Sequence, residues 1–409
     1  RVCAFTATQI PFIAQRSYPH ELAPDSYDSD IPIYDESELP ALIKTLAIDF
    51  VFFSYSDLAH AQVMHRASIV QAAGASFVLL GPAQTSLSSR SKVVAVTATR
   101  TGTGKSPLTQ WLARSLVDEG VKVVTIRHPM PYGNLRAQAV QRFASTADLD
   151  AQDCTIEERE EYSPYVSQGL VIFAGVDYEA IVRAAEAEAD LILWDGGNND
   201  FSFVSADLNI VVCDALRAGH GLDYYPGEPN FRAADIVVIN KVGAAAAEDI
   251  QTIKSLKDAI NPSAGLVTAD LDVTVEAPER LRGKRVLIVE DGPTVTHGGM
   301  GYGAGWVAAH KYGVGEVLDP RTSAVGSLLD TFNAYPQLLA VLPAMGYSQR
   351  QRQELKASID GSGADLVLNA SPADVGRALE LGLPVVQVKY RFAPQSGDDL
   401  LASVRTLLA

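Results

Sequence analysis

The stretch VVAVTATRTGTGKSPLTQWLARSL, from Val93 to Leu116, decides the fold, because it joins an apolar strand, a glycine-rich turn and an amphipathic helix. Gly102 and Gly104 let successive backbone N–H groups point at an anion beside a helix N-terminus. Lys105 offers a cation for the β- and γ-phosphates, and Ser106 a hydroxyl for Mg²⁺. The full pattern G-x-x-x-x-G-K-[ST] begins with Gly, whereas this chain has Thr99. We predict a P-loop that binds ATP and Mg²⁺ through Gly102, Thr103, Gly104, Lys105 and Ser106.

Length and composition limit the class of protein. The chain has 409 residues and a formal net charge of −16, which argues against nucleic acid or an anionic membrane as a partner. Three cysteines without metal-type spacing, and no apolar run of about 18 residues, favour a cytoplasmic protein with free thiols. The chain begins at Arg1 rather than Met, which leaves open whether residues precede it. We also expect a homo-oligomer, with a dimer as our guess.

Alternating strand and helix patterns predict an α/β protein of three parts. Residues 1–88 resemble a Rossmann-like α/β domain, although no glycine-rich dinucleotide turn is visible in them. Residues 89–283 continue the pattern through near-continuous apolar strands, which indicates a doubly wound P-loop NTPase domain. Residues 284–409 are again α/β and could extend the same sheet. The acidic run EEREE, Glu157 to Glu161, follows a capping box of Thr155 and Glu158, and we expect it to be a solvated helix face.

Polar residues at the ends of the predicted strands are candidates for the chemistry. Asp195 ends the strand LILWD, where a carboxylate suits Mg²⁺. Asn240 and Lys241 end a later strand and are candidates for the nucleotide base, and Gly243 lacks the carboxylate that guanine needs, which favours adenine. Arg127 and His128 lie in RHPMPYG, a loop expected beside the γ-phosphate. Each of these residues also has a plain structural reading, as a turn cap or a loop side chain.

Two further loops are weaker candidates for substrate binding. Arg217 and His220 follow a strand that ends at Asp214, and His220 is as readily an ordinary loop residue. Gly298 and Gly299 lie in THGGMGYGAG, where a second anion cradle and a close-packed turn are equally good interpretations.

Together, the motifs TGTGKS, RHPMPYG with QRF, EEREEY, WDGGNND, INK, EDGPTVTHGGMGYGAG and LPAMGYS resemble the cyclic 2,3-diphosphoglycerate synthetase family. The resemblance covers nearly the whole chain, including AFTATQIP at its front. It implies an ATP-dependent ligase that closes 2,3-diphosphoglycerate into a cyclic phosphoanhydride and releases ADP and phosphate. It also implies nucleotide and Mg²⁺ roles for Lys105, Ser106 and Asp195, and a substrate role for Arg127 and His128. The catalytic set is then Lys105, Asp195, Arg127 and His128, and the partner is a small anionic phosphorylated substrate.

Other functions remain open on the same fold. One is a carboxylate-activating ligase similar to dethiobiotin synthetase. Another is a nucleotide switch or a metallochaperone ATPase, although seven His and three Cys show no paired ligand spacing. A ligand-sensing module without catalysis fits least, because Lys105, Ser106 and Asp195 together suit hydrolysis or transfer.

Overall fold

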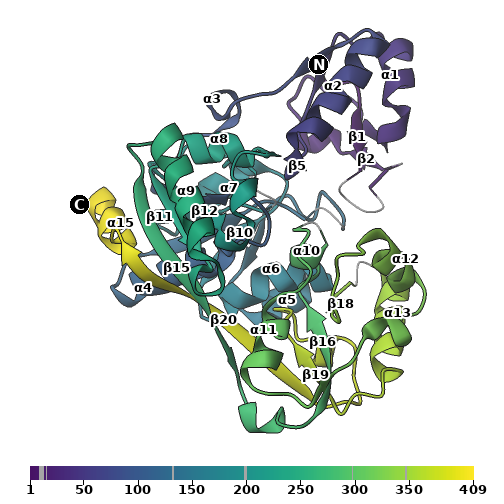
Figure 1. Cartoon of the computed structure of the whole chain (residues 1–409). Coiled ribbons are helices and arrows are strands. Elements are labelled where there is room, and N and C mark those ends of the chain that lie inside the picture. Colours follow the sequence, from purple (N-terminus) through teal and green to yellow (C-terminus); the bar gives the residue numbers. More distant parts are fainter. Residues whose placement is uncertain (9–12, 15, 131–132, 198–199, 297, 346–347) are drawn as a thin grey trace.

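The computed structural model describes residues 1–409 except 9–12, 15, 131–132, 198–199, 297 and 346–347. Parts of five quoted motifs, AFTATQIP, RHPMPYG, WDGGNND, the glycine-rich THGGMGYGAG and LPAMGYS, therefore lie outside the described residues. Figure 1 shows three lobes: one formed by the N-terminal part of the chain, a large central lobe, and a third lobe below them. We call them the N-terminal, central and C-terminal regions and keep the ranges 1–88, 89–283 and 284–409, whose use as domain boundaries stays a prediction.

The central region is built around β7, the strand that precedes the P-loop. Strand β7 lies between β11 and β12 and pairs with both in parallel. Its residues alternate between two buried faces, which is why the sequence has a continuous apolar run here. The elements of this region are β7 (Lys92–Ala98), α4 (Lys105–Asp118), β8 (Val123–Arg127), β9 (Gln141–Phe143), α5 (Thr146–Ala151), α6 (Ile156–Val166), β10 (Val171–Ala174), α7 (Tyr178–Glu186), β11 (Leu191–Asp195), β12 (Leu208–Asp214), β13 (Tyr224–Tyr225), α8 (Gly227–Arg232), β14 (Ile236–Asn240), α9 (Ala247–Ile260) and β15 (Gly265–Val275).

Helices cover both faces of this sheet. Val94 and Val96 pack in one core with residues of α4 and α6, whereas Val93 and Ala95 pack on the opposite face against α7. On that second face, β12 and β14 pack against α8 and α9. The arrangement is doubly wound, as the apolar strands predict.

The C-terminal region continues the same sheet. The strand order is β17-β16-β19-β20-β15-β14-β12-β7-β11-β8-β10-β9, with β18 beside β16. The long antiparallel pair β15–β20 joins the two halves, and β20 crosses between them in Figure 1. The elements are β16 (Arg285–Glu290), α10 (Gly292–Val295), α11 (Ala304–Lys311), β17 (Glu316–Val317), α12 (Ser327–Ala334), β18 (Leu342–Pro343), α13 (Gln349–Asp360), β19 (Leu366–Asn369), α14 (Val375–Ala378), β20 (Val385–Gly397) and α15 (Leu400–Leu408).

The N-terminal region alternates strands and helices, as its sequence pattern predicts, but its strands do not form one parallel sheet. Strands β1 and β3 pair in parallel and β2 joins them antiparallel, while β4 and β6 form a separate parallel pair. The Rossmann-like prediction for this region is therefore not confirmed. Its elements are β1 (Phe5–Ala7), β2 (Ser17–Tyr18), β3 (Ile31–Asp35), α1 (Leu39–Thr45), β4 (Phe50–Phe52), β5 (Leu58–Ala59), α2 (His60–Ala73), β6 (Ser76–Val78) and α3 (Pro82–Thr85). Strand β5 pairs antiparallel with β13, which ties this region to the central one.

The prediction of a solvated acidic helix is wrong for most of EEREE. The capping box of Thr155 and Glu158 is present, but Glu157, Glu158 and Glu160 of α6 are all buried. Helix α6 packs through Tyr162 and Tyr165 into the same core as β7, so its polar side faces other protein rather than water. A run of charges does not reveal which elements cover it.

Replacing Phe392 with Ala tests whether β20 joins two cores. Phe392 is buried in the core of the central region, 5.3 Å from the Trp111 ring between centroids, whereas Val386 and Val388 of the same strand belong to the C-terminal core. We expect Phe392→Ala to lower the free energy of unfolding by about 3–5 kcal/mol, measured by urea denaturation. Phe50→Ala, at an exposed ring of β4, serves as control, and equal losses in the two variants would contradict the arrangement.

Candidate functional site

The predicted P-loop, residues 99–106, has the backbone shape that its glycines indicate. Gly102 and Gly104 have φ values of +77° and +99°, which side chains rarely adopt. Gly104 is also closely approached, because a Cβ there would lie 2.3 Å from Asn240 Nδ2. Helix α4 begins directly at Lys105, which is buried. Burial lowers the pKa of Lys105 to about 8, while Asp195 acts in the opposite direction.

Side chains from distant segments hold the carbonyl groups of this loop. Asn240 Nδ2 donates to Thr103 O over 2.7 Å, and Lys241 Nζ donates to Gly102 O over 2.7 Å. Arg217 donates to Thr101 O over 2.8 Å and to Gly298 O over 2.6 Å. Asp214 binds both Lys241 and Arg217 through Oδ2. Asn240, Lys241 and Arg217 therefore position the loop, and a role for Asn240 and Lys241 toward the base stays a prediction.

Arg127 lies between the two residues predicted to bind Mg²⁺. Its guanidinium donates to Ser106 Oγ over 3.1 Å and forms ion pairs with Asp195 and Glu161. Burial opposes the charge of Arg127, but the two carboxylates outweigh it and raise the pKa of the guanidinium. Tyr165 donates to Asp195 Oδ2 over 2.8 Å. The structure thus brings Lys105, Ser106, Arg127 and Asp195 together, with Arg127 already neutralised by protein.

The donor set around Asp195 suits a divalent cation. Asp195 is fully buried, and its Oδ1 has no hydrogen-bond partner among the described residues. An unpaired buried carboxylate oxygen beside a serine hydroxyl offers the oxygen ligands that Mg²⁺ prefers. Ser106 and Asp195 therefore fit the predicted metal site.

His128 and His220 are not free cations. His128 Nδ1 lies 2.7 Å from Asp200 Oδ2, and sequence analysis did not single out Asp200. His220 Nδ1 lies 2.9 Å from an Arg100 nitrogen, and burial with Arg100 and Arg217 nearby lowers the pKa of its imidazole. A neutral His220 accepts a hydrogen bond from Arg100, which argues against its predicted role in binding an anionic substrate.

Protein fills the second glycine-rich cradle. Glu290 ends β16 and accepts hydrogen bonds from the N–H groups of Gly303, Gly305 and Trp306 at 3.0, 3.2 and 2.9 Å. Burial raises the pKa of Glu290 to about 7, against the effect of those bonds. Gly298 lies over the P-loop rather than at this cradle, since its Cβ would be 3.2 Å from Thr101 O, and Gly299 has a φ of +67°. The interpretation as a close-packed turn fits this loop better than a substrate cradle at Gly298 and Gly299.

Two residues that the sequence pattern did not reveal complete the surroundings of the loop. Asp57 of the N-terminal region accepts from Arg100 Nε over 2.9 Å and from Thr101 N over 3.3 Å. Asp270 of β15 accepts from Gly243 N over 2.9 Å. Asp270 thus brings a carboxylate close to Gly243, the position at which a guanine site would have an Asp. Both oxygens of Asp270 bind backbone N–H groups, those of Gly243 and Leu271.

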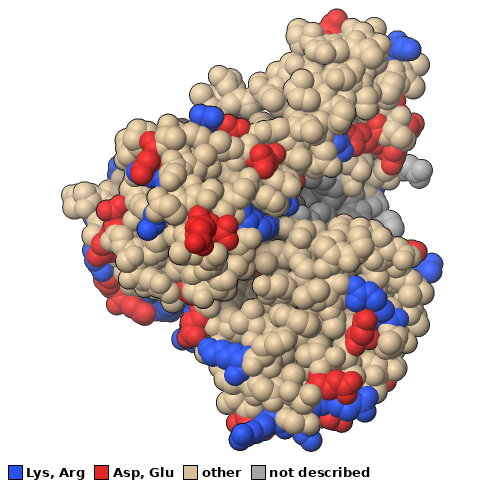
Figure 2. Space-filling model, viewed as in Figure 1, with Lys and Arg blue, Asp and Glu red and all other residues tan. Residues whose placement is uncertain are grey.

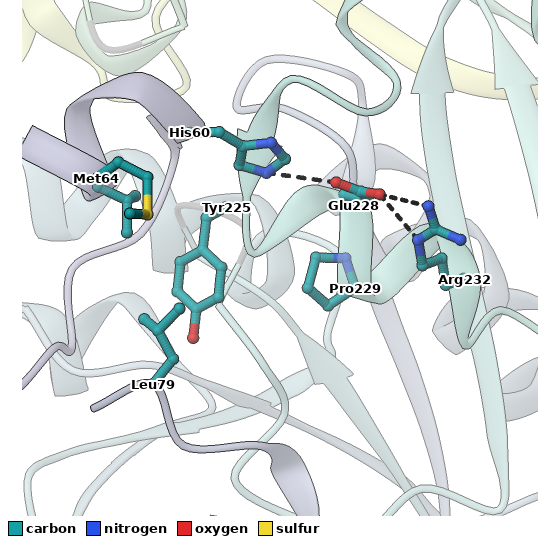
Figure 3. Close-up of a pocket in the computed structure, with 8 residues that line it drawn as sticks. His60, Met64, Leu79, Tyr225, Glu228, Pro229 and Arg232 are labelled. Carbon is teal, nitrogen blue, oxygen red and sulfur yellow. Dashed lines mark hydrogen bonds and ion pairs between the residues drawn. The ribbon is translucent and has the colours of Figure 1, made fainter. Parts of the chain in front are cut away.

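A separate pocket of about 290 Å³ lies at the seam between α2 and α8. In Figure 3, Glu228 contacts His60 and Arg232 at one side, while Met64, Leu79 and Tyr225 form an apolar wall. None of the predicted site residues lines it.

Among the described residues, no helix has the length and apolar character needed to cross a bilayer. On the face shown in Figure 2, basic and acidic residues are interspersed.

Removing Arg127 tests the buried ion pairs. Arg127→Ala leaves Asp195 and Glu161 without their cation, so we expect a loss of about 3–5 kcal/mol in unfolding free energy. Arg142→Ala is the control, because it removes a surface pair with Glu188 and should cost at most about 1 kcal/mol. The free energy of unfolding of both variants is measured by urea denaturation. Similar small losses in the two variants would contradict the ion pairs of Arg127 with Asp195 and Glu161.

Comparison with known proteins gives one long match and several partial ones. No family model matches the chain. It is 55% identical over 389 residues to arginine synthetase ArcE of Thermococcus kodakarensis, covering 95% of this chain and 87% of that protein. It is 28% identical over 130 residues to a cyclic 2,3-diphosphoglycerate synthetase of Thermococcus sibiricus, covering 31% and 29%. A tetraacyldisaccharide 4'-kinase of Janthinobacterium matches 149 residues at 32% identity, covering 36% and 41%.

Solved structures show only distant similarity. LpxK of Aquifex aeolicus, solved with ATP, covers 90% of this chain and 98% of its own at 11% identity, with a TM-score of 0.43. The MinC:MinD complex of the same organism covers 44% and 81% at 17% identity, with a TM-score of 0.25. Both TM-scores are below 0.5, so neither structure indicates a shared function. The match at 55% identity covers nearly the whole of both chains, so the chain belongs to the family of arginine synthetase ArcE.

Proposed function

We propose that this protein is an ATP- and Mg²⁺-dependent ligase that phosphorylates a small acceptor and completes arginine by forming a carbon–nitrogen bond. The observation that carries the proposal is the grouping of Lys105, Ser106 and Asp195 at one buried junction. The chain's long match to an arginine synthetase supplies the product. The motifs and this match both support an ATP-dependent ligase. The product that we propose is arginine instead of cyclic 2,3-diphosphoglycerate.

The nucleotide half of the proposal rests on charge and shape. In such loops the backbone N–H groups and the lysine ammonium bind the β- and γ-phosphates, and we assign these roles to the P-loop and to Lys105. Ser106 and Asp195 would hold Mg²⁺, which neutralises charge that builds up during phosphoryl transfer. Catalysis at this half of the site is therefore positioning and charge neutralisation.

The charges around the P-loop favour an acceptor with a cationic group over a polyanion. Arg127 is paired with Asp195 and Glu161, and His128 faces Asp200. Within the described part of the chain, the cations that sequence analysis assigned to a phosphorylated acid are thus bonded to protein. A diphosphorylated acid would have to displace those carboxylates.

Carboxylates on the side of the C-terminal region offer the complementary chemistry. Glu160 is buried; its Oε1 binds Ser371 Oγ, and its Oε2 has no partner among the described residues. Burial raises the pKa of Glu160 well above its usual range, and Asp291 adds to the effect. A guanidinium or ammonium group placed here would satisfy that oxygen and neutralise the cluster. These carboxylates suit the ammonium group of an amino-acid acceptor.

The reaction balances with two displacements. A carbonyl oxygen of the ureido counterpart of arginine attacks the γ-phosphorus, and the bond to ADP breaks. A nitrogen nucleophile then attacks the activated carbon, and phosphate leaves with the former carbonyl oxygen. The nitrogen loses a proton to a base as the guanidinium forms.

Closure of 2,3-diphosphoglycerate stays the second candidate. It is favoured by the shorter match at 28% identity and by the motifs that first suggested that family. Both candidates share the nucleotide half of the site, and they differ in the charge of the acceptor.

Phosphate release decides between the acceptors. With ATP and Mg²⁺, we expect the ureido counterpart of arginine plus ammonium to stimulate release of ADP and phosphate and to yield arginine detectable by mass spectrometry. Lys105→Ala should abolish this release, because the cation for the β- and γ-phosphates is lost, whereas Lys44→Ala of α1, outside the P-loop, should retain it. Stimulation by 2,3-diphosphoglycerate alone would return the acceptor to a phosphorylated acid, and full activity of a folded Lys105→Ala variant would refute the P-loop assignment.

A further inference from the structure

His128 and Asp200 form a pair with a defined geometry. His128 follows β8 directly, and its Nδ1 lies 2.7 Å from Asp200 Oδ2, with both side chains mostly buried. A carboxylate only accepts hydrogen bonds, so it selects the form in which Nδ1 carries the proton. Nε2 is then left with a lone pair. Sequence analysis assigned His128 a substrate and catalytic role but no partner.

The imidazole lies over the turn that follows Asp195. A Cβ at Gly197 would be 2.1 Å from His128 Cε1 and 2.2 Å from Nε2, so the ring needs a glycine at this position. Gly197 comes two residues after the proposed Mg²⁺ ligand. In a P-loop site, the turn after that strand borders the γ-phosphate. The turn that Nε2 approaches is thus the one expected to border a phosphorylated acceptor.

Charged and polar groups from three elements surround the pair. Burial raises the pKa of Asp200, but His128, a hydrogen bond from Ser56 and the charge of Lys105 outweigh it, so the net pKa is lowered. Asp57 lies next to Ser56 on the N-terminal region. Burial, with a smaller contribution from the charge of Asp200, raises the pKa of Tyr178 of α7. Asp200 thus stays ionised and holds the ring in place.

We propose that His128 is the general base of the second displacement and that Asp200 positions it. As the nitrogen nucleophile bonds to the activated carbon and phosphate leaves, one N–H proton passes to His128 Nε2, and the imidazolium is stabilised by Asp200. The proton returns to water when the product leaves. This role rests on the proposed ligase function and adds to it the residues that move the proton.

The chain offers a matched control for this pair. His20 Nδ1 lies 2.8 Å from Asp30 Oδ1 in the N-terminal region, with the same chemistry but half-exposed. Asp30→Asn therefore removes a His–Asp hydrogen bond away from the P-loop. Asp200→Asn makes the same replacement of a carboxylate by an amide beside His128, and His128→Gln removes the imidazole itself.

Single-turnover formation of arginine from pre-bound ATP and the ureido acceptor is measured against pH, together with ATP binding. We expect Asp200→Asn and His128→Gln to slow the amine-dependent step by about 10²–10⁴-fold. Binding of ATP should change by less than about twofold, and Asp30→Asn should behave as wild type. The wild-type rate should depend on pH, and this dependence should weaken in His128→Gln. In ¹⁵N NMR of the free protein, His128 should show a protonated Nδ1 that is lost or exchanged in Asp200→Asn.

The outcomes separate the two claims. Turnover in wild type with an unchanged rate in Asp200→Asn and His128→Gln would overturn the base role and leave the ligase standing. Tight ATP binding without amine-dependent turnover in wild type would overturn the ligase proposal, and the base role with it. A protonated Nε2 in the NMR spectrum would overturn the base role by itself, whatever the turnover.

Discussion

The rest of the site depends on hydrogen bonds that fix the P-loop from outside. A loop with two glycines of positive φ is free to adopt many shapes. Here Asn240, Lys241 and Arg217 bind its carbonyl groups, and Asp57 binds the N–H group of Thr101. Because the carbonyls are held, the remaining N–H groups stay available to phosphate. Each lobe contributes: Asp57 comes from the N-terminal region, and Gly298 of the C-terminal region shares Arg217 with the loop.

Charge balance then determines what else the site can accept. The chain carries a formal charge of −16, and buried carboxylates occupy the surroundings of the P-loop. Arg127 is held by the buried Asp195 and by the partly exposed Glu161, and Glu290 fills a cradle of N–H groups that an anion could have used. Asp214 similarly neutralises Lys241 and Arg217. Under the proposed function, a site built in this way takes the phosphates of ATP at the P-loop and favours a cationic group elsewhere.

Sequence reasoning succeeded where the signal is local. The strand, glycine turn and helix around Lys105, the capping box at Thr155 and the apolar strands all depend on neighbours in the chain. It failed where the partner is distant. His128 and Asp200 are 72 positions apart, and Asp57 is 43 from Arg100. Glu157 and Glu160 look like a solvated face until α6 is packed against other elements. No periodicity encodes such tertiary contacts, so the contacts of Arg217 with Thr101 and of His220 with Arg100 could not be predicted.

The central claim is that ATP activates a carbonyl oxygen of the acceptor at this loop. The most direct measurement follows that oxygen, with the ureido counterpart of arginine labelled with ¹⁸O and the released phosphate examined by ³¹P NMR or mass spectrometry. The account predicts one ¹⁸O atom in each phosphate, because the oxygen leaves on phosphorus. Unlabelled phosphate formed together with arginine would contradict it, since the carbon would then have been activated without phosphoryl transfer.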